Sequence, residues 1–399
     1  LIYLLTLVLS YRNKERGVGI LLITKPPMGW NSWNTFMDKI DEKTIMETAD
    51  AMVNQGLLKA GYEYLVIDDS WAERERDAEG RLKVNYTKFP NGMKAVADYV
   101  HSKGLKFGMY SCAGVRTCMC YPGSFGHEFQ DARFFADIGV DYLKYDYCFR
   151  PALADGPMLY NRMGMALRAA GRDILFSACN WGKDNTTEWI RSTGAHMFRS
   201  TTDIMDSYQS MKNIALSQLS NLPYTAPGCF NDLDMLIVGL HGKGCMALGA
   251  DGCSDIEYRQ HFAFWCMLSA PLMIGADVRD LSPDTLALLT NRELLAIDQD
   301  PEVRPPYIHG QALQRPECAQ EHIVLLKHLA DGNYAAGYFN FGDQEANIPS
   351  EFYNWGIDIS SGCSLQFTDV FTGEDMGIFR DFYRARVPAH DCRLYKVRL

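Results

Sequence analysis

The sequence predicts a (β/α)8 barrel, an α/β TIM-type fold, followed by a C-terminal antiparallel β-sandwich domain. Between Pro26 and Asp300, short apolar runs alternate with longer amphipathic segments, which is typical of repeated strand–helix units. From Gln311 onward, the chain changes to short aromatic or β-branched runs separated by turn residues. The length of 399 residues has room for one barrel of about 250 residues and one smaller domain.

The barrel strands are predicted from the apolar runs. They are expected at residues 28–31, 64–68, 106–110, 142–146, 175–178, 196–199, 234–237 and 272–274. Amphipathic segments predict helices over 93–103, 128–138, 159–170 and 207–219. Eight such units favour a closed barrel, and no GxGxxG follows any of these strands, so an open dinucleotide-binding sheet is the weaker alternative.

The sandwich strands are predicted at VLLKHL, YAAGYFNF, SLQFTDVF and CRLYKVRL, with Gly, Asp and Asn turns between them. The Pro-rich VRPPY at 303–307 suits a linker. We therefore divide the chain into an N-terminal extension (1–25), a barrel (26–305) and a β-sandwich (306–399).

Charge and hydropathy exclude several classes of partner. Lys and Arg number 39 against 49 Asp and Glu, and the net charge of −10 argues against a surface that binds nucleic acid. The apolar segment Leu1–Ser10 has about half the length of a membrane span, so no membrane anchor is expected. A signal remnant, a translated upstream stretch and a packed strand remain open for this extension.

Polar residues stand at or just beyond the ends of several predicted strands. They are Asp68, Asp69, Tyr110, Lys144, Asp146, Asn180, Arg199, Asp203 and Asp234. A single Asp after a strand is usually a turn or helix-cap residue. Carboxylates at four strand ends indicate an active site, because the C-terminal ends of barrel strands line the active-site mouth.

Carboxylates that share a cavity repel each other unless a cation or a ligand relieves the repulsion. The chain has no HxH, HExxH or EF-hand spacing, so no metal and no cofactor are predicted. Sugar chemistry explains the pattern better, because Trp30, Trp33, Trp71, Trp181 and Tyr110 supply aromatic faces beside the strand ends. Glycoside hydrolysis needs two carboxylates, and Asp146 with Asp203 is the natural pair.

The sequence resembles glycoside hydrolase family 27, the α-galactosidase and α-N-acetylgalactosaminidase family. The matching stretches follow the family order over about residues 26–301, and they include PPMGWNSWNTF (26–36), YEYLVIDDSW (62–71), TCMCYPGSFG (117–126), DYLKYDYC (141–148), FRSTTDIMDSY (198–208) and NDLDML (231–236). The family also carries a C-terminal β-sandwich.

The resemblance implies a retaining exo-α-galactosidase that hydrolyses terminal α-linked galactose with Asp146 as nucleophile and Asp203 as acid/base. Retention implies carboxyl groups about 5–5.5 Å apart. The residues implied or expected to bind the sugar are Trp30, Asp68, Asp69, Tyr110, Lys144, Asn180, Trp181, Arg199 and Asp234. Asp206, the nearest competitor of Asp203, is interpreted as a residue at a helix N-terminus.

The charges of the two carboxylates are predicted from their neighbours. Lys144 alternates with Asp146 on one strand, so Asp146 is expected to be ionised. The charge on Asp146 is then expected to raise the pKa of Asp203.

Asn180 departs from the family pattern, because eukaryotic α-galactosidases usually have Glu there, facing the 2-substituent of the sugar. Galactose remains the expected sugar, and an α-N-acetylgalactosaminidase or a β-L-arabinopyranosidase is the alternative on the same scaffold. A catalytically silent carbohydrate-binding barrel is the alternative of another class. Hydrolysis and transglycosylation are not separated by the sequence.

The resemblance also implies a disulfide between Cys118 and Cys148, with Cys120 as a neighbour that competes for it. The remaining cysteines of the 12 have no assigned partners and are interpreted as buried or free thiols. So many unassigned thiols favour a reducing compartment, so we expect a cytoplasmic, bacterial protein rather than a secreted one. Exposed aromatic residues in the sandwich permit a homo-oligomer.

Overall fold

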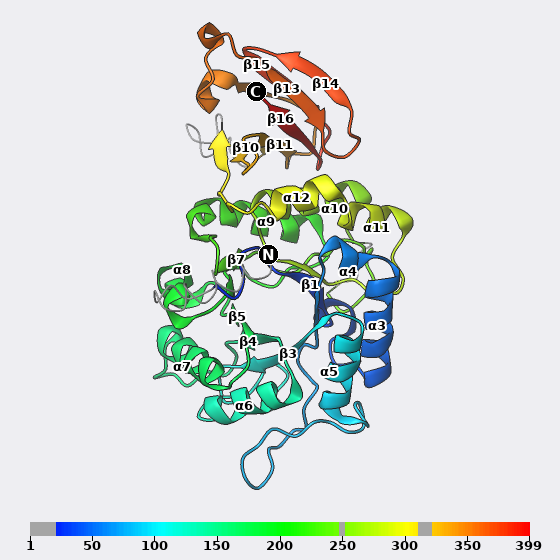
Figure 1. The fold of residues 1–399 in the computed structure, drawn as a ribbon, viewed down its shortest axis with the longest axis vertical. Coiled ribbons are helices and arrows are strands. Elements are labelled where there is room, and N and C mark those ends of the chain that lie inside the picture. The colour runs from blue at the N-terminus through cyan, green and yellow to red at the C-terminus, as the bar shows by residue number, and fades with distance from the viewer. Residues whose placement is uncertain (1–20, 247–251, 310–320) are drawn as a thin grey trace, which may run out of the picture.

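The computed structural model describes residues 21–246, 252–309 and 321–399. The barrel and the β-sandwich are stacked along the long axis of the molecule (Figure 1). The predictions for Leu1–Ser10 and Cys318 lie outside the described residues. Within the described ranges, no helix has both the length and the apolar character that a membrane span requires.

Eight parallel strands form the barrel sheet in the order β7-β6-β5-β4-β3-β2-β1-β8. They are β1 (Met28–Asn31), β2 (Tyr64–Val66), β3 (Lys106–Cys112), β4 (Tyr142–Asp146), β5 (Leu175–Cys179), β6 (Met197–Arg199), β7 (Phe230–Asp232) and β8 (Leu272–Ile274). Beyond β7, Leu236 forms a parallel bridge with Ile274 of β8. The Leu236 N–H donates to the Met273 carbonyl at 2.8 Å, so the two edges of the sheet meet and the predicted barrel is confirmed.

The predicted strands agree closely with the observed ones except for the seventh. The bounds of β1, β4 and β8 match, and those of β2, β3, β5 and β6 differ by one or two residues. The prediction of a strand at 234–237 is wrong, because the seventh strand is Phe230–Asp232. Asp234 takes a left-handed conformation with φ of 84°, and the apolar run after it packs as buried core instead of forming a strand.

Helices surround the barrel. They are α2 (Trp33–Phe36), α3 (Glu42–Asn54), α4 (Leu57–Ala60), α5 (Gly92–Ser102), α6 (Glu128–Ile138), α7 (Gly156–Ala169), α8 (Thr186–Trp189), α9 (Tyr208–Ser217), α10 (Asp255–Met267), α11 (Pro283–Leu289) and α12 (Arg292–Asp298). The helix predicted at 159–170 begins earlier, at Gly156, because Asp155 caps it by accepting from the Met158 N–H. Ser254 and Glu257 form a capping box at α10.

Short 3-10 segments occur in the barrel loops and in the second domain. They are Lys183–Asn185, Ile190–Thr193, Gln218–Ser220, Leu222–Tyr224, Phe352–Trp355 and Ile359–Ser361. The helix predicted over 207–219 ends as an α-helix at Ser217 and continues as one of these 3-10 turns.

The second domain contains a six-stranded sheet in the order β14-β13-β16-β11-β10-β9 and a two-stranded sheet of β12 and β15. The strands are β9 (Tyr307–His309), β10 (His322–His328), β11 (Tyr334–Asn340), β12 (Ala346–Glu351), β13 (Leu365–Asp369), β14 (Asp375–Phe379), β15 (Phe382–Val387) and β16 (Cys392–Arg398). The four predicted strands correspond to β10, β11, β13 and β16, whereas β9, β12, β14 and β15 were not predicted. The boundary at 305 stays a prediction.

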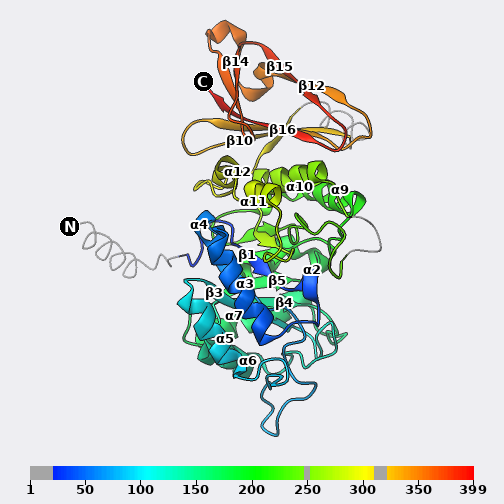
Figure 2. The ribbon, with the colours of Figure 1, turned by 90° about the vertical axis from the view of Figure 1, so that its right-hand side faces the viewer.

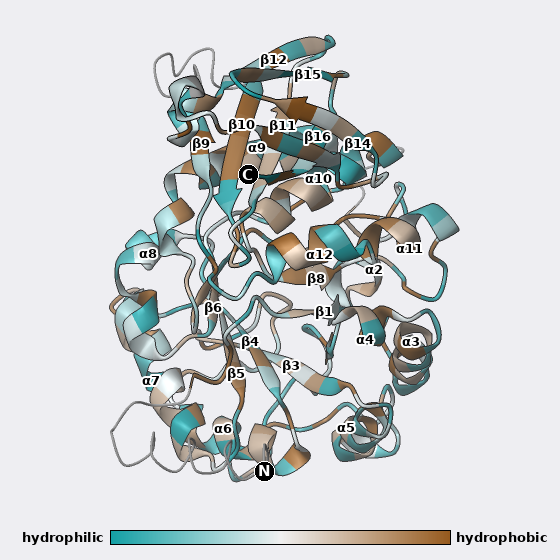
Figure 3. Cartoon of the chain, turned by 45° about the horizontal axis from the view of Figure 1, so that its top comes forward, coloured by the Kyte–Doolittle hydropathy of each residue, from teal (hydrophilic) through white to brown (hydrophobic). Residues whose placement is uncertain are grey.

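The two sheets enclose an aromatic core. Phe367, Tyr383, Tyr395 and Tyr338 contact one another there, and the Phe367 and Tyr383 rings stack with centroids 4.5 Å apart. Strand β10 is mainly hydrophobic (Figure 3) and is buried along most of its length. These contacts form a core between the two sheets, whereas Ile323, Leu325 and Phe339 of the same six-stranded sheet pack into the hydrophobic cluster of the barrel.

Helices α10 and α12 lie between the barrel and the sandwich in both views (Figures 1 and 2). The Gln260 side chain of α10 donates to the carbonyl oxygens of Asn340 and Asp391, each at 2.8 Å. Arg259 pairs with the buried Asp391 at 2.6 Å. These polar contacts fix the sandwich against the side of the barrel formed by α10.

Candidate active site

A cavity of about 420 Å³, counting its open mouth, lies at the C-terminal ends of the barrel strands. Its wall is formed by Trp33, Asn34, Asp68, Asp69, Tyr110, Cys118, Lys144, Asp146, Trp181, Arg199, Asp203, Asp234, Met235 and Met246. Strand ends that are far apart in the sequence therefore meet in one site, as the barrel prediction requires.

Asp68 and Asp69 follow β2 and are almost completely buried. Asp68 Oδ2 accepts from Lys144 Nζ and from the Asn31 amide, each at 2.8 Å. Asp69 accepts from the backbone N–H groups of Ser70 and Met119. Lys144 compensates the charge of Asp68, whereas burial raises the pKa of Asp69 to about 6.

Asp146 ends β4 and is 6% exposed. Its Oδ2 accepts from the Tyr110 hydroxyl at 2.9 Å and lies 3.4 Å from Cys118 Sγ. Its Oδ1 is buried and has no hydrogen-bond partner among the described residues. One carboxylate oxygen is thus held in place by the Tyr110 hydroxyl, while the other is buried without such a partner.

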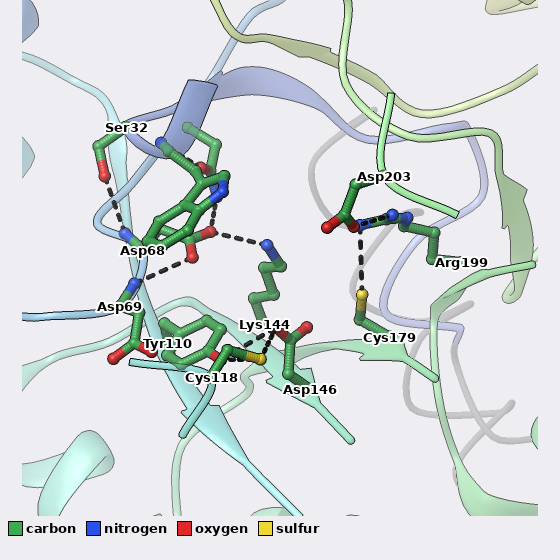
Figure 4. A network of polar contacts seen from close by, with 12 residues as sticks. Ser32, Asp68, Asp69, Tyr110, Cys118, Lys144, Asp146, Cys179, Arg199 and Asp203 are labelled. Carbon is green, nitrogen blue, oxygen red and sulfur yellow. Dashed lines mark hydrogen bonds and ion pairs between the residues drawn. The ribbon is translucent and has the colours of Figure 1, made fainter. Parts of the chain in front are cut away.

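Arg199 and Asp203 form an ion pair at the end of β6 on the other side of the cavity (Figure 4). Arg199 also lies 3.3 Å from Asp234 Oδ2, and its Nη1 donates to the Cys179 sulfur at 3.6 Å. Asp234 Oδ2 accepts from the N–H of Ile204 at 2.7 Å. Because Ile204 directly follows Asp203, this contact anchors the backbone that carries the second carboxylate.

The predicted rise in the pKa of Asp203 is wrong, and so is the predicted order of the two pKa values. Burial raises the pKa of Asp146, and the attraction of Lys144 offsets this only in part, because Lys144 Nζ hydrogen-bonds to Asp68 instead. Burial also acts to raise the pKa of Asp203, but the charge and hydrogen bond of Arg199 outweigh it and lower that pKa. The two carboxylates therefore have the reverse of the expected order of ionisation.

Comparison with known proteins agrees with this geometry. Residues 25–300 match the family model described as alpha galactosidase A, and residues 319–397 match the model of the alpha galactosidase C-terminal beta sandwich domain. The chain is 39% identical to the α-galactosidase of Cyamopsis tetragonoloba over 382 residues, which are 96% of this chain and 87% of that protein. The chain belongs to the α-galactosidase family.

Solved structures of the α-galactosidase family have the same fold. α-Galactosidase I from Mortierella vinacea superposes with a TM-score of 0.84 at 31% identity, covering 94% of this chain and 97% of the other. The α-galactosidase of Saccharomyces cerevisiae, solved with raffinose, has a TM-score of 0.82 at 27% identity, covering 94% and 98%. As a member of this family, the protein is a glycoside hydrolase.

Most of the predicted sugar-binding residues of this α-galactosidase family member line the cavity, but Trp30 and Asn180 do not. The Trp30 indole is fully buried and donates to the Ala276 carbonyl at 2.8 Å. The Asn180 amide donates to the Lys183 carbonyl at 2.8 Å and accepts from the Thr186 hydroxyl. Both side chains are engaged in hydrogen bonds to the chain around the cavity, and their assignment as sugar-binding residues stays a prediction.

Other residues take the places expected of these two. Trp33 and Asn34 reach the cavity from the first turn after β1, and Trp181 lines it from a left-handed backbone conformation with φ of 58°. Met235 and Met246 also line it and were not predicted. Met235 follows Asp234 in NDLDML, so its place next to a predicted residue was the available signal.

Asp206 does not line the cavity within the described residues. It precedes Ser207, which caps α9, so the interpretation as a residue at a helix N-terminus is close to its position. The buried Asp206 carboxylate accepts from the Tyr258 hydroxyl at 2.8 Å and from the N–H groups of Gly242 and Cys253. It therefore holds both ends of the loop before α10, which leaves Asp203 as the carboxylate of this segment in the site.

The disulfide between Cys118 and Cys148 is present, with Cα atoms 5.2 Å apart. It joins the loop after β3 to the residue two positions beyond Asp146. Among the described residues, nine other cysteines are free, and Cys120 is the exposed one. The cytoplasmic location inferred from these thiols stays a prediction.

Proposed function

We propose that the protein is a retaining exo-α-galactosidase that releases terminal α-linked galactose by double displacement. The observation that carries this proposal is the pair of carboxylates on opposite sides of one cavity, Asp146 with a free oxygen and Asp203 beside Arg199 (Figure 4). Two carboxylates with different environments are what this mechanism requires. The separation of about 5–5.5 Å between the two carboxyl groups stays a prediction.

In the first step, the Asp146 carboxylate attacks the anomeric carbon and the bond to the leaving oxygen breaks. Asp203 gives its proton to that oxygen. In the second step, Asp203 takes a proton from water, the water oxygen bonds to the anomeric carbon, and Asp146 is released. Tyr110 keeps Asp146 Oδ2 fixed through both steps, since its hydroxyl donates at 2.9 Å.

Substrate hydroxyls are bound by the charged groups of the wall. Asp68 and Asp69 accept hydrogen bonds, and Lys144 donates from a position already fixed by Asp68. The faces of Trp33 and Trp181 offer apolar contact with the ring. The cavity lies at one end of the barrel, so a chain end can enter it, which supports exo action.

Arg199 links substrate binding to the acid/base. In the free enzyme it holds Asp203 ionised, and an ionised Asp203 has no proton to give. A sugar hydroxyl that accepts from Arg199 weakens this ion pair and allows Asp203 to be protonated. The acid is thus prepared by the bound substrate rather than by the empty site.

Azide rescue tests the two roles separately. Asp146→Ala should abolish turnover of an activated aryl α-galactoside, and azide should restore it with a β-galactosyl azide as product. Asp203→Ala should lose about 10²–10⁴-fold in rate, and azide should give the α-galactosyl azide. Asp137→Ala, which removes an exposed carboxylate on α6, is the matched control and should retain activity.

Two results would contradict the assignment. One is substantial turnover by Asp146→Ala without azide, and the other is the same anomer of galactosyl azide from both variants. Comparison of nitrophenyl α-galactoside, α-N-acetylgalactosaminide and β-L-arabinopyranoside identifies the sugar. We expect the highest kcat/KM on the galactoside, and a higher value on either of the others would replace galactose as the substrate.

A further inference from the structure

The disulfide of the site lies against the proposed nucleophile. Cys118 Sγ is 3.4 Å from Asp146 Oδ2, and one ligand atom each of Cys118, Cys148 and Asp146 lie within 4.8 Å of one another. In the described residues, no other group of three or more His, Cys, Asp or Glu side chains is arranged closely enough to hold a metal ion. Cysteine sulfur and carboxylate oxygen are both ligands of Zn²⁺, and thiophilic cations prefer the sulfurs.

We propose that reduction of the disulfide between Cys118 and Cys148 converts this cluster into a binding site for a thiophilic divalent cation, Zn²⁺ or Cd²⁺. The two thiolates and the Asp146 carboxylate are the protein ligands, and the open cavity leaves the fourth position to water. Metal binding would engage Asp146, so this enzyme would be inhibited by the cation only in its reduced form. The inhibition rests on the proposed function, whereas the binding does not.

The geometry requires little rearrangement. Tetrahedral zinc has Zn–S distances of about 2.3 Å and Zn–O distances of about 2.0–2.2 Å, which place a sulfur and an oxygen ligand about 3.6 Å apart. The observed separation of Cys118 Sγ from Asp146 Oδ2 is 3.4 Å. The two sulfurs must move apart to about 3.8 Å when their bond is broken, and Cys148 Sγ starts within 4.8 Å of the Asp146 ligand oxygen.

The surroundings allow both the reductant and the cation to enter. Cys118 lines the cavity, and Cys118 and Cys148 are both partly exposed. Asp69 contributes a carboxylate on the same wall. Lys144, the nearest cation to Asp146 on β4, hydrogen-bonds to Asp68, which compensates its charge.

The chemical steps balance with a dithiol as reductant. The dithiol supplies two electrons and two protons, its sulfurs join to each other, and the bond between the cysteine sulfurs breaks to give two thiols. The cation then displaces both thiol protons and forms two metal–sulfur bonds. A chelator reverses the second step, and oxidation of the thiols by a disulfide reverses the first.

Cd²⁺ titration of the oxidised and the reduced protein tests the proposal, with thiolate-to-metal charge-transfer absorbance as the signal. Because other free thiols are present, the measured quantity is the number of Cd²⁺ ions gained on reduction. We expect one additional ion per chain in the wild type and in Cys120→Ser, the control for a free thiol near the disulfide. We expect no gain in a Cys118→Ser, Cys148→Ser double variant.

Asp146→Asn provides a second measurement in a chain that keeps its disulfide. After reduction it should bind the additional Cd²⁺ at least about tenfold more weakly, since a neutral amide replaces the carboxylate. The site would be overturned if reduction added no Cd²⁺ to the wild type, or if it added as many ions to the double cysteine variant as to the wild type. It would also be overturned if Asp146→Asn bound the additional Cd²⁺ with the affinity of the wild type.

Activity completes the test. Zn²⁺ should inhibit the reduced enzyme at least about tenfold and a chelator should restore it, while the oxidised enzyme stays active. Equal inhibition of both forms would overturn the redox control. The charge-transfer signal does not depend on turnover, so failure of the galactosidase proposal and failure of the metal site give different results.

Discussion

Tyr110→Phe tests how the site controls the charge of Asp146. The Tyr110 hydroxyl donates to Asp146 Oδ2 at 2.9 Å, and Oδ1 has no partner among the described residues. The variant therefore removes a hydrogen bond from a buried carboxylate while keeping the aromatic ring. Such a bond to a charged group contributes about 1.5–3 kcal/mol. Because one pKa unit corresponds to about 1.4 kcal/mol, we expect the pKa of Asp146 to rise by about 1–2 units.

The pH profile shows which carboxylate ionises last. Burial raises the pKa of Asp146, whereas Arg199 outweighs burial at Asp203 and lowers the pKa of that carboxyl. Because Asp146 has the higher pKa, the alkaline limb of the kcat/KM profile belongs mainly to Asp146. We expect Tyr110→Phe to move this limb to higher pH by about 1–2 units and to leave the acid limb in place. The maximum should fall about 10–100-fold, because fewer molecules hold Asp146 ionised while Asp203 is protonated.

Tyr145→Phe is the matched control. Tyr145 precedes Asp146 on β4, and its buried hydroxyl has no hydrogen-bond partner among the described residues. Its removal should leave both limbs where they are in the wild type. A shift of the acid limb in Tyr110→Phe would refute the reversed order of ionisation. An unchanged profile would refute the role of the tyrosine hydroxyl.

Three substitutions around the barrel have separate expected effects. Asn180→Ala should lower the free energy of unfolding by about 1–3 kcal/mol, because the Asn180 amide hydrogen-bonds to the turn that follows it. KM for a nitrophenyl α-galactoside should stay nearly unchanged. A large rise in KM would show that Asn180 binds the sugar. Gly29→Ala should lower the free energy of unfolding by about 1–3 kcal/mol or more, and with it the melting temperature, since the Cβ of the alanine would lie 2.3 Å from the Tyr64 carbonyl oxygen. An unchanged melting temperature would contradict this clash. Trp30→Phe should lower the free energy of unfolding, measured with a denaturant, by about 1–3 kcal/mol, because it leaves the Ala276 carbonyl unpaired. A change close to zero would show that this hydrogen bond is dispensable.

The sequence could predict the barrel because its strands are short apolar runs with helices between them. This signal failed at β7, where the true strand Phe230–Asp232 has one apolar residue and the stronger apolar run after Asp234 forms core packing. In the sandwich, β14 buries little of its surface and β12 contains Pro349, so neither has a clear strand pattern. Strand β15 alternates exposed and buried residues, and this signal could have been found.

The site could be predicted because residues at the C-terminal ends of barrel strands must face one opening. Asp68, Asp146 and Asp203 needed only this rule to be brought together. The direction of a side chain at the strand end is set by nearby hydrogen-bond partners, and a sequence does not show these. Trp30 and Asn180 hydrogen-bond to a carbonyl and a hydroxyl that the chain brings near them only after folding.

The order of the pKa values of Asp146 and Asp203 could not be predicted, because it depends on which carboxylate each nearby cation pairs with. Lys144 alternates with Asp146 along β4, yet its ammonium group hydrogen-bonds to Asp68, which follows β2. Arg199 then remains for Asp203, and the buried Asp146 is left with a tyrosine hydroxyl. Since the proposed reaction needs a protonated Asp203, the ion pair between Arg199 and Asp203 opposes the reaction in the free enzyme. The hydroxyls of a bound sugar weaken this ion pair if they compete with Asp203 for Arg199, which links recognition of the sugar to the chemistry.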